Sequence, residues 1–158
     1  MKLTTKGRYA VMALADIAAQ GEEGAVALSE IATRQDISQA YLEQLFKKLR
    51  AAGVVESVRG AAGGYALARP AADIRVAEII AAADEQIHAT ACAPGSHAGC
   101  RGGTARCMTH DLWDELGRQI EIFLQAVTLE DVVERRVLGM AAVNPPNRQT
   151  APRALERA

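Results

Sequence analysis

The 158-residue sequence has only three cysteines, almost no net charge and no long hydrophobic segment. An odd number of cysteines, and so few, argues against a disulfide framework and favours metal or redox chemistry. No apolar run approaches the roughly 20 residues that span a bilayer, and the N-terminus lacks the apolar core of an export signal. We therefore expect a cytoplasmic protein that makes no membrane contact.

The net charge of the chain by itself excludes few classes of protein. Residues 1–75 carry 10 Lys and Arg against 8 Asp and Glu, whereas residues 76–158 carry 8 against 11. This N-terminal basic excess is too small to identify a nucleic-acid-binding protein, so the placement of particular residues must decide. With 49% hydrophobic residues, the chain can bury one modest core, or a small domain plus an extension that needs a partner.

Three helices are predicted in the first third of the chain. The first covers residues 8–18 after a cap at Thr4 or Thr5, and the second is short, from Ser29 to about Gln35. Ser38 then caps a third helix over residues 39–52, in which apolar residues recur at helical spacing, and Gly53 ends it. The connection of residues 36–38 between the last two helices is as tight as that of a helix-turn-helix motif.

A β-hairpin is predicted next, because residues 54–58 and 65–67 have strand composition and flank a glycine-rich segment. No Gly-Lys-Ser/Thr follows these glycines, so they do not form a phosphate-binding P-loop. A further helix over residues 76–83 is expected to pack against the first and close the domain. We therefore predict a mainly α fold with a small β wing, in which residues 1–83 form a winged helix-turn-helix domain that binds double-stranded DNA.

The third helix and the wing supply the candidate DNA-binding residues. Short polar groups of the helix can meet base edges or phosphates, and an arginine at the start of a glycine loop can enter the minor groove. The alternative is that the helix residues are ordinary solvated side chains and the arginine a surface residue. The candidates are Ser38, Tyr41, Glu43, Gln44, Lys47, Arg59 and Gly60.

Residues 84–110 form a predicted ligand-binding loop without hydrophobic periodicity. It contains Cys92, Cys100 and Cys107, and His110 follows the last cysteine after two residues. Three thiolates and an imidazole suit either an iron-sulfur cluster or a structural zinc ion, and ligand type alone leaves both open. His88 and His97 lie in the same segment and could compete with His110 for the fourth position.

A long apolar helix is predicted from Asp111, within residues 111–138, where large apolar residues recur at three- and four-residue steps over about four turns. Such a helix outside a small domain needs a partner, and a second copy in a homodimer is the simplest one. Thr128 caps a short helix expected over residues 129–138, and the proline-containing tail, residues 139–158, is expected to be disordered.

The sequence resembles the iron-sulfur cluster regulator family typified by IscR over roughly residues 1–138. The likeness lies in residues 41–46 (Tyr-Leu-Glu-Gln-Leu-Phe), Ser57-Val58-Arg59-Gly60, Gly63-Gly64-Tyr65, the three cysteines and residues 109–113 (Thr-His-Asp-Leu-Trp). The resemblance implies DNA contacts by Tyr41, Glu43, Gln44 and Arg59. It also implies a 2Fe-2S cluster on Cys92, Cys100, Cys107 and His110.

By this resemblance, the cluster-bound form represses genes for cluster assembly, and the assembly machinery donates the cluster. One alternative keeps the fold and changes the signal, giving a nitric-oxide- or iron-responsive regulator. Another is a zinc-stabilised adaptor that binds protein, which leaves the helix-turn-helix and wing unexplained. An enzyme is not expected, because no nucleophile and base occur at a catalytic spacing.

Overall fold

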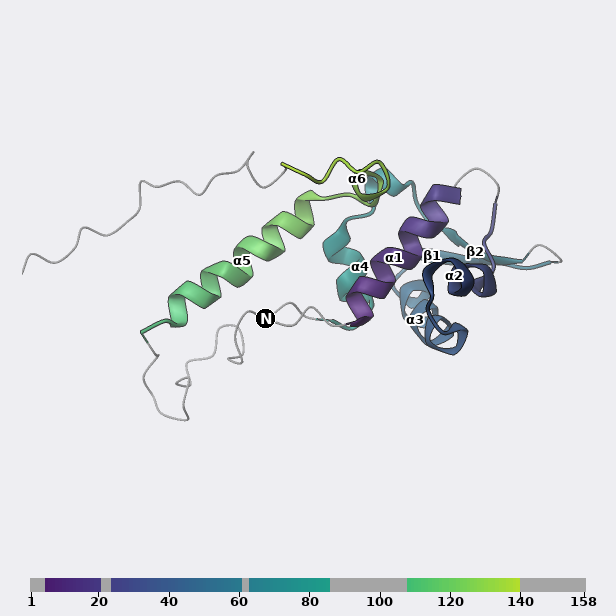
Figure 1. Cartoon of the computed structure of the whole chain (residues 1–158), viewed down its shortest axis with the longest axis horizontal. Helices are drawn as coiled ribbons and strands as arrows, with labels where there is room; N and C mark the ends of the chain where they lie inside the picture. Colours follow the sequence, from purple (N-terminus) through teal and green to yellow (C-terminus); the bar gives the residue numbers. More distant parts are fainter. Residues whose placement is uncertain (1–4, 21–23, 61–62, 86–107, 140–158) are drawn as a thin grey trace, which may run out of the picture.

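The computed structural model describes residues 5–20, 24–60, 63–85 and 108–139 of the chain (Figure 1). Within these ranges the protein is mainly helical, with one two-stranded antiparallel sheet. The elements run in the order α1 (Thr5–Gln20), α2 (Leu28–Gln35), α3 (Gln39–Ala51), β1 (Val55–Val58), β2 (Gly64–Leu67), η1 (Ala71–Asp73), α4 (Val76–Ala82), α5 (His110–Ala126) and α6 (Leu129–Val133). The predicted fold class is confirmed.

The helix-turn-helix consists of α2 and α3, joined by residues 36–38. Asp36 ends α2 in the left-handed conformation (φ 53°), which Asp tolerates better than most residues, and Ser38 then caps α3. One expectation was wrong in detail. The second helix begins at Leu28 rather than at Ser29, because Ala27 occupies the N-cap position and its carbonyl accepts the first helical hydrogen bonds.

A single core holds the first three helices, the hairpin and α4 together. Ile31 of α2, Phe46 of α3 and Leu14 of α1 are all fully buried in it. Each such side chain contributes about 1.5–3 kcal/mol when it leaves water. The predicted packing of α4 against α1 is confirmed. We call this unit, from α1 to α4, the winged domain.

The long helix α5 leaves the winged domain at an angle, so that its N-terminal half extends away from the rest of the described chain (Figure 1). Its C-terminal end is tied back to the domain. Val76 donates a backbone hydrogen bond to the carbonyl of Val127 (3.0 Å), and Leu129 donates one to Ile74 (2.8 Å). These bonds fix the direction in which α5 leaves the winged domain.

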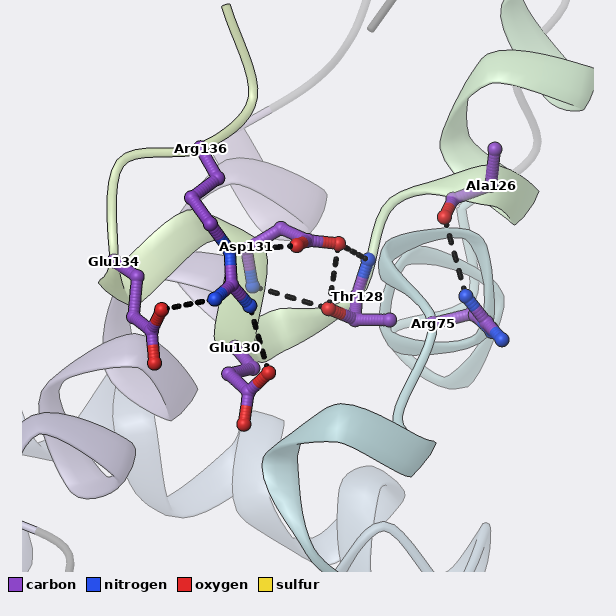
Figure 2. Close-up of polar contacts among 7 residues, drawn as sticks. All are labelled: Arg75, Ala126, Thr128, Glu130, Asp131, Glu134 and Arg136. Atoms are coloured by element: carbon purple, nitrogen blue, oxygen red, sulfur yellow. Dashed lines mark hydrogen bonds and ion pairs between the residues drawn. The ribbon is translucent and has the colours of Figure 1, made fainter.

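Figure 2 shows the polar contacts that shape this junction. The Arg75 guanidinium donates to the carbonyl of Ala126 (3.1 Å), one of the last carbonyls of α5. Thr128 and Asp131 then form a reciprocal capping box that starts α6. The cap at Thr128 is confirmed.

The short helix α6 ends at Val133 rather than at Leu138, because Arg135 adopts a positive φ of 57° and breaks the helical path. Helix α6 packs on α1 and η1, and Leu129 is fully buried in the main core. The segment after α5 therefore returns to the winged domain. The division of the chain at residues 83, 110 and 138 stays a prediction.

None of the helices in the described ranges is long and apolar enough to span a membrane. Residues 140–158, which contain nearly all of the expected disordered tail, lie outside the described residues.

Candidate nucleic-acid interface

Helix α3 forms because its apolar residues recur every three or four positions and its N-terminus has a capping side chain. The Ser38 hydroxyl accepts a hydrogen bond from the backbone N–H of Tyr41 (3.3 Å). Buried Leu42, Leu45, Phe46 and Leu49 hold one side of the helix on the core. The opposite side is left to solvent, which is the arrangement a recognition helix needs.

The predicted contact residues of α3 lie on or beside this exposed side. Glu43 and Lys47 are exposed, and Glu43 accepts a hydrogen bond from the side-chain amide of Gln39 (3.1 Å). Tyr41 is half-buried, and its ring lies edge-on to that of Tyr9 with 5.7 Å between centroids. The Tyr41 side chain is therefore held by a residue of α1, whereas the Glu43 side chain is held by a residue of its own helix.

The hairpin forms the wing. Strand β1 pairs with β2 in the register Val55 to Leu67 and Val58 to Gly64, and Tyr65 bridges to Val26 before α2. A side chain at position 64 would collide with the backbone of Val26, so this close approach requires glycine. The wing is thereby fixed to the strand-like segment that enters the helix-turn-helix.

Arg59 and Gly60 follow β1 directly and are exposed. Gly60 has a φ of 130°, which side chains rarely permit, and its carbonyl accepts a hydrogen bond from Gly63 N–H (3.0 Å). This turn lets the chain reverse immediately after Arg59, so that Arg59 lies next to the tip. Residues 61 and 62, between Gly60 and Gly63, lie outside the described residues.

Sequence reasoning missed one charged contact of the recognition helix. Lys48 Nζ lies 2.7 Å from Asp84 Oδ2, just after α4. The Lys48 ammonium lowers the pKa of Asp84, first through this hydrogen bond and then through its charge. The two residues are 36 positions apart, and no local pattern pairs them.

Of the four predicted cluster ligands, only His110 is described. It is the first residue of α5 and is buried, at 8% exposure, although most of that helix is exposed. Cys92, Cys100 and Cys107 lie outside the described residues, as do His88 and His97. The structure therefore locates one end of the predicted ligand set and leaves its assembly a prediction.

The chain matches a family model described as an iron-dependent transcriptional regulator, over residues 3–135. It belongs to the Rrf2 family. A putative HTH-type transcriptional regulator of Neisseria meningitidis is 55% identical over 139 residues, covering 88% of this chain and 92% of that protein. The HTH-type transcriptional regulator IscR of Photorhabdus laumondii is 48% identical over 153 residues, covering 96% and 92%.

Solved structures of this Rrf2 protein's relatives agree with the fold. IscR from T. potens superposes with a TM-score of 0.68 at 38% identity, covering 86% of this chain and 88% of that one. CymR, the global cysteine regulator of B. subtilis, gives a TM-score of 0.71 at 31% identity, with 85% and 98% covered. The chain is thus a transcriptional regulator of a DNA-binding family and not an enzyme.

Proposed function

We propose that this chain is an iron-sulfur-sensing transcription regulator that represses cluster assembly genes in its cluster-bound form. The observation that carries the proposal is the position of His110. This buried imidazole begins α5, three positions after Cys107, and so ends the segment that joins the winged domain to α5. The relatives named IscR, 46–52% identical over most of the chain, support the same function.

The donor set suits a 2Fe-2S cluster, because thiolates are soft ligands and an imidazole can replace a thiolate in such a cluster. Cys92, Cys100, Cys107 and His110 would hold it, and the cluster assembly machinery would donate it. When bound, the cluster supplies a redox-active centre that is lost when iron or sulfide runs short. His110 is positioned by the first turn of α5, so the occupancy of this ligand set affects a residue of the helix that leads back to the winged domain.

The DNA-binding surface of the proposed function combines α3 with the wing. Glu43, Gln44 and Lys47 project from the exposed side of α3 into the major groove, and Arg59 enters the minor groove from the wing. Ser38 sets the start of the helix, Tyr41 supports it from α1, and Gly60 lets the wing backbone approach the phosphates. The protein acts in the cytoplasm, where the promoter operators are.

A homodimer through α5 completes the proposal. Leu112, Trp113 and Leu116 are 62%, 44% and 39% exposed, although all three are large apolar residues on one helix. An uncovered apolar stripe of this kind marks an interaction surface. A second copy of α5 would cover it and present two winged domains to two half-sites.

The test is the anaerobic ultraviolet-visible spectrum of the full chain, with iron, sulfide and zinc analysis. We expect visible charge-transfer bands with iron and sulfide in the wild-type protein, and their loss in Cys92→Ala. His110→Ala should weaken or shift the bands, whereas the matched control His97→Ala should leave them unchanged.

A colourless wild-type protein with stoichiometric zinc would contradict cluster sensing and leave a metal-stabilised DNA-binding protein. Bands that move in His97→Ala but not in His110→Ala would reassign the fourth ligand. Repression is tested by comparing the affinity of the loaded and cluster-free proteins for a duplex that the loaded protein has selected from random sequence. Equal affinity would contradict a cluster-dependent switch.

A further inference from the structure

A small basic pocket lies between the N-terminal turn of α1 and the recognition helix. Its volume is about 120 Å³, and it is lined by Lys6, Tyr41, Gln44, Leu45, Lys48 and Ala83. A single water needs only about 10–15 Å³ on this measure, so the pocket has room for a larger polar group. Two ammonium groups, a phenol and an amide give it several hydrogen-bond donors and a positive charge.

Asp84 brings a negative charge to Lys48 of this pocket. Its carboxylate is 2.7 Å from Lys48 Nζ, and the positive charge of Lys6 also acts on it. The Asp84 and Lys48 side chains are 73% and 41% exposed. Because exposed ion pairs are weak and exchange readily with other ions, this contact can be replaced by another anion.

The backbone at Asp84 is held in place by the end of α4. Asp84 N–H donates to Ala81 (3.0 Å) and Glu85 N–H donates to Ile80 (3.3 Å), the two bonds of a Schellman motif. Asp84 occupies the left-handed position of that motif, with φ 57°, where glycine is the favoured residue. Aspartate tolerates this conformation better than most residues but less well than glycine, and an exposed ion pair adds little stability, so fold stability alone favours glycine over aspartate here.

Glu85 fixes the same turn from the other side. It is 6% exposed, and its carboxylate accepts a hydrogen bond from Gly7 N–H in the first turn of α1 (2.5 Å). A Cβ at position 7 would lie 2.5 Å from that oxygen, so the close approach depends on glycine. The turn at residues 84–85 is therefore anchored to α1 while Asp84 contacts α3.

We propose that the basic pocket binds a backbone phosphate of operator DNA and that Asp84 is a built-in competitor for Lys48. Before DNA binds, the carboxylate takes the place of the phosphate at Lys48. On binding, a phosphodiester oxygen replaces the carboxylate at Lys48. Because Tyr41 and Gln44 of α3 line the same pocket, this exchange takes place at the recognition helix itself. The inference rests on the proposed DNA-binding surface but not on the cluster.

A consequence is that Asp84 lowers the affinity for DNA below the value that Lys6 and Lys48 would give without it. Asp84 also directly precedes Glu85 and the segment of residues 86–110 that carries the proposed ligands. The competitor thus lies where that segment leaves the winged domain.

The experiment measures binding of the full-length protein to a duplex selected from random sequence by the wild-type chain, using fluorescence anisotropy over a series of salt concentrations. We expect Asp84→Asn to bind about tenfold more tightly as a dimer and with a steeper salt dependence, because a repulsive charge is removed and Lys48 is released. The matched control Asp73→Asn changes the net charge equally at an exposed site on η1 and should bind like the wild type.

Two further variants separate competition from general electrostatics and from folding. In a Lys48→Gln background, Asp84→Asn should lose most of its effect, because there is no lysine to release. Asp84→Gly should unfold at the same or a higher temperature than the wild type and still bind DNA more tightly.

Equal affinity of Asp84→Asn and Asp73→Asn would overturn the inference, as would a gain that persists undiminished in the Lys48→Gln background. In both cases the wild-type protein still binds the duplex, so the proposed function survives. A wild-type chain that selects no duplex would instead overturn the proposed function.

Discussion

Asp16 joins α1 to α2 by side-chain hydrogen bonds. It is 7% exposed and accepts hydrogen bonds from Arg34 Nη2 (2.7 Å) and the Gln35 amide (2.8 Å). Burial on its own would raise the pKa of Asp16, but the hydrogen bonds of Arg34 and Gln35 and the charge of Arg34 together lower it. The first helix of the helix-turn-helix motif is thereby held on the core through its last turn.

We expect Asp16→Asn to lower the free energy of unfolding by about 2 kcal/mol at pH 7, because it removes charge-assisted hydrogen bonds at a buried site. Since the folded-state pKa of Asp16 is depressed, its contribution is complete above the unfolded-state pKa of about 3.9. The contribution is lost as the pH falls through the folded-state pKa. The difference between variant and wild type should therefore shrink below about pH 4.

Urea unfolding at several pH values measures this difference, with the exposed Asp73→Asn as control. A loss of stability that is the same at pH 3 and pH 7 would show that the Asp16 charge is not responsible.

At the scale of an element, the wing is a hairpin whose two ends have different neighbours. Next to its turn-side pair, Val58 and Gly64, the hairpin is fixed by the bridge between Tyr65 and Val26 and by the packing of the Tyr65 ring on Phe46, with 4.8 Å between centroids. The turn-side ends of β1 and β2 extend away from the helices of the domain (Figure 1), and Arg59 follows β1 directly. Because this anchor lies close to the turn, the arginine that follows β1 is presented in a constant direction relative to α3.

Arg59→Ala should weaken operator binding by about tenfold and reduce the preference for narrow minor grooves, while leaving the melting temperature within about 1 °C. Arg69→Ala is the matched control, because Arg69 lies beyond the base of the hairpin and pairs with Glu78. Anisotropy titrations against operators with and without a central A-tract measure both effects. An Arg59→Ala protein with unchanged affinity and sequence preference would remove this arginine from the interface.

At the scale of the whole molecule, α5 and its junction with α4 and α6 determine how two copies can be arranged. The junction holds the C-terminal end of α5 through the backbone bonds of Val76 and Leu129. It also holds this end through the contact of Arg75 with Ala126, which Figure 2 shows. The other half of α5 carries the exposed apolar stripe. In the proposed dimer, the separation of the two recognition helices follows from the angle at this junction.

We expect Leu116→Asp to convert the proposed dimer to a monomer, because it places a carboxylate in the apolar stripe. Gln125→Asp is the control, since it introduces the same group on the opposite side of α5, where the side chain is exposed. Sedimentation velocity gives the molecular mass of each. A Leu116→Asp protein of the same mass as the wild type would show that this stripe is not the interface.

Much of the architecture follows from local sequence. Ser38 predicts the start of α3, Thr128 predicts the start of α6, and the glycine-rich segment predicts the hairpin, because caps and turns depend on residues only a few positions apart. The start of α2 was missed by a residue because Ala27 caps it with its backbone alone. The early end of α6 was missed because the left-handed conformation of Arg135 has no strong local signal.

The candidate DNA-binding residues and metal ligands also come from the sequence, because residue type carries chemistry directly, whereas the choice of a 2Fe-2S cluster over zinc rests on the family resemblance. Tertiary structure alone brought Asp84 to Lys48, Glu85 to Gly7 and Leu129 into the core of the winged domain. These contacts join residues far apart in the chain, and they form only when α4 packs on α1 and α5 turns back at the junction. The sequence by itself thus determined where the helices begin and the chain turns and which groups are candidates for binding DNA and metal, and the packing of the helices decided which charges lie against one another.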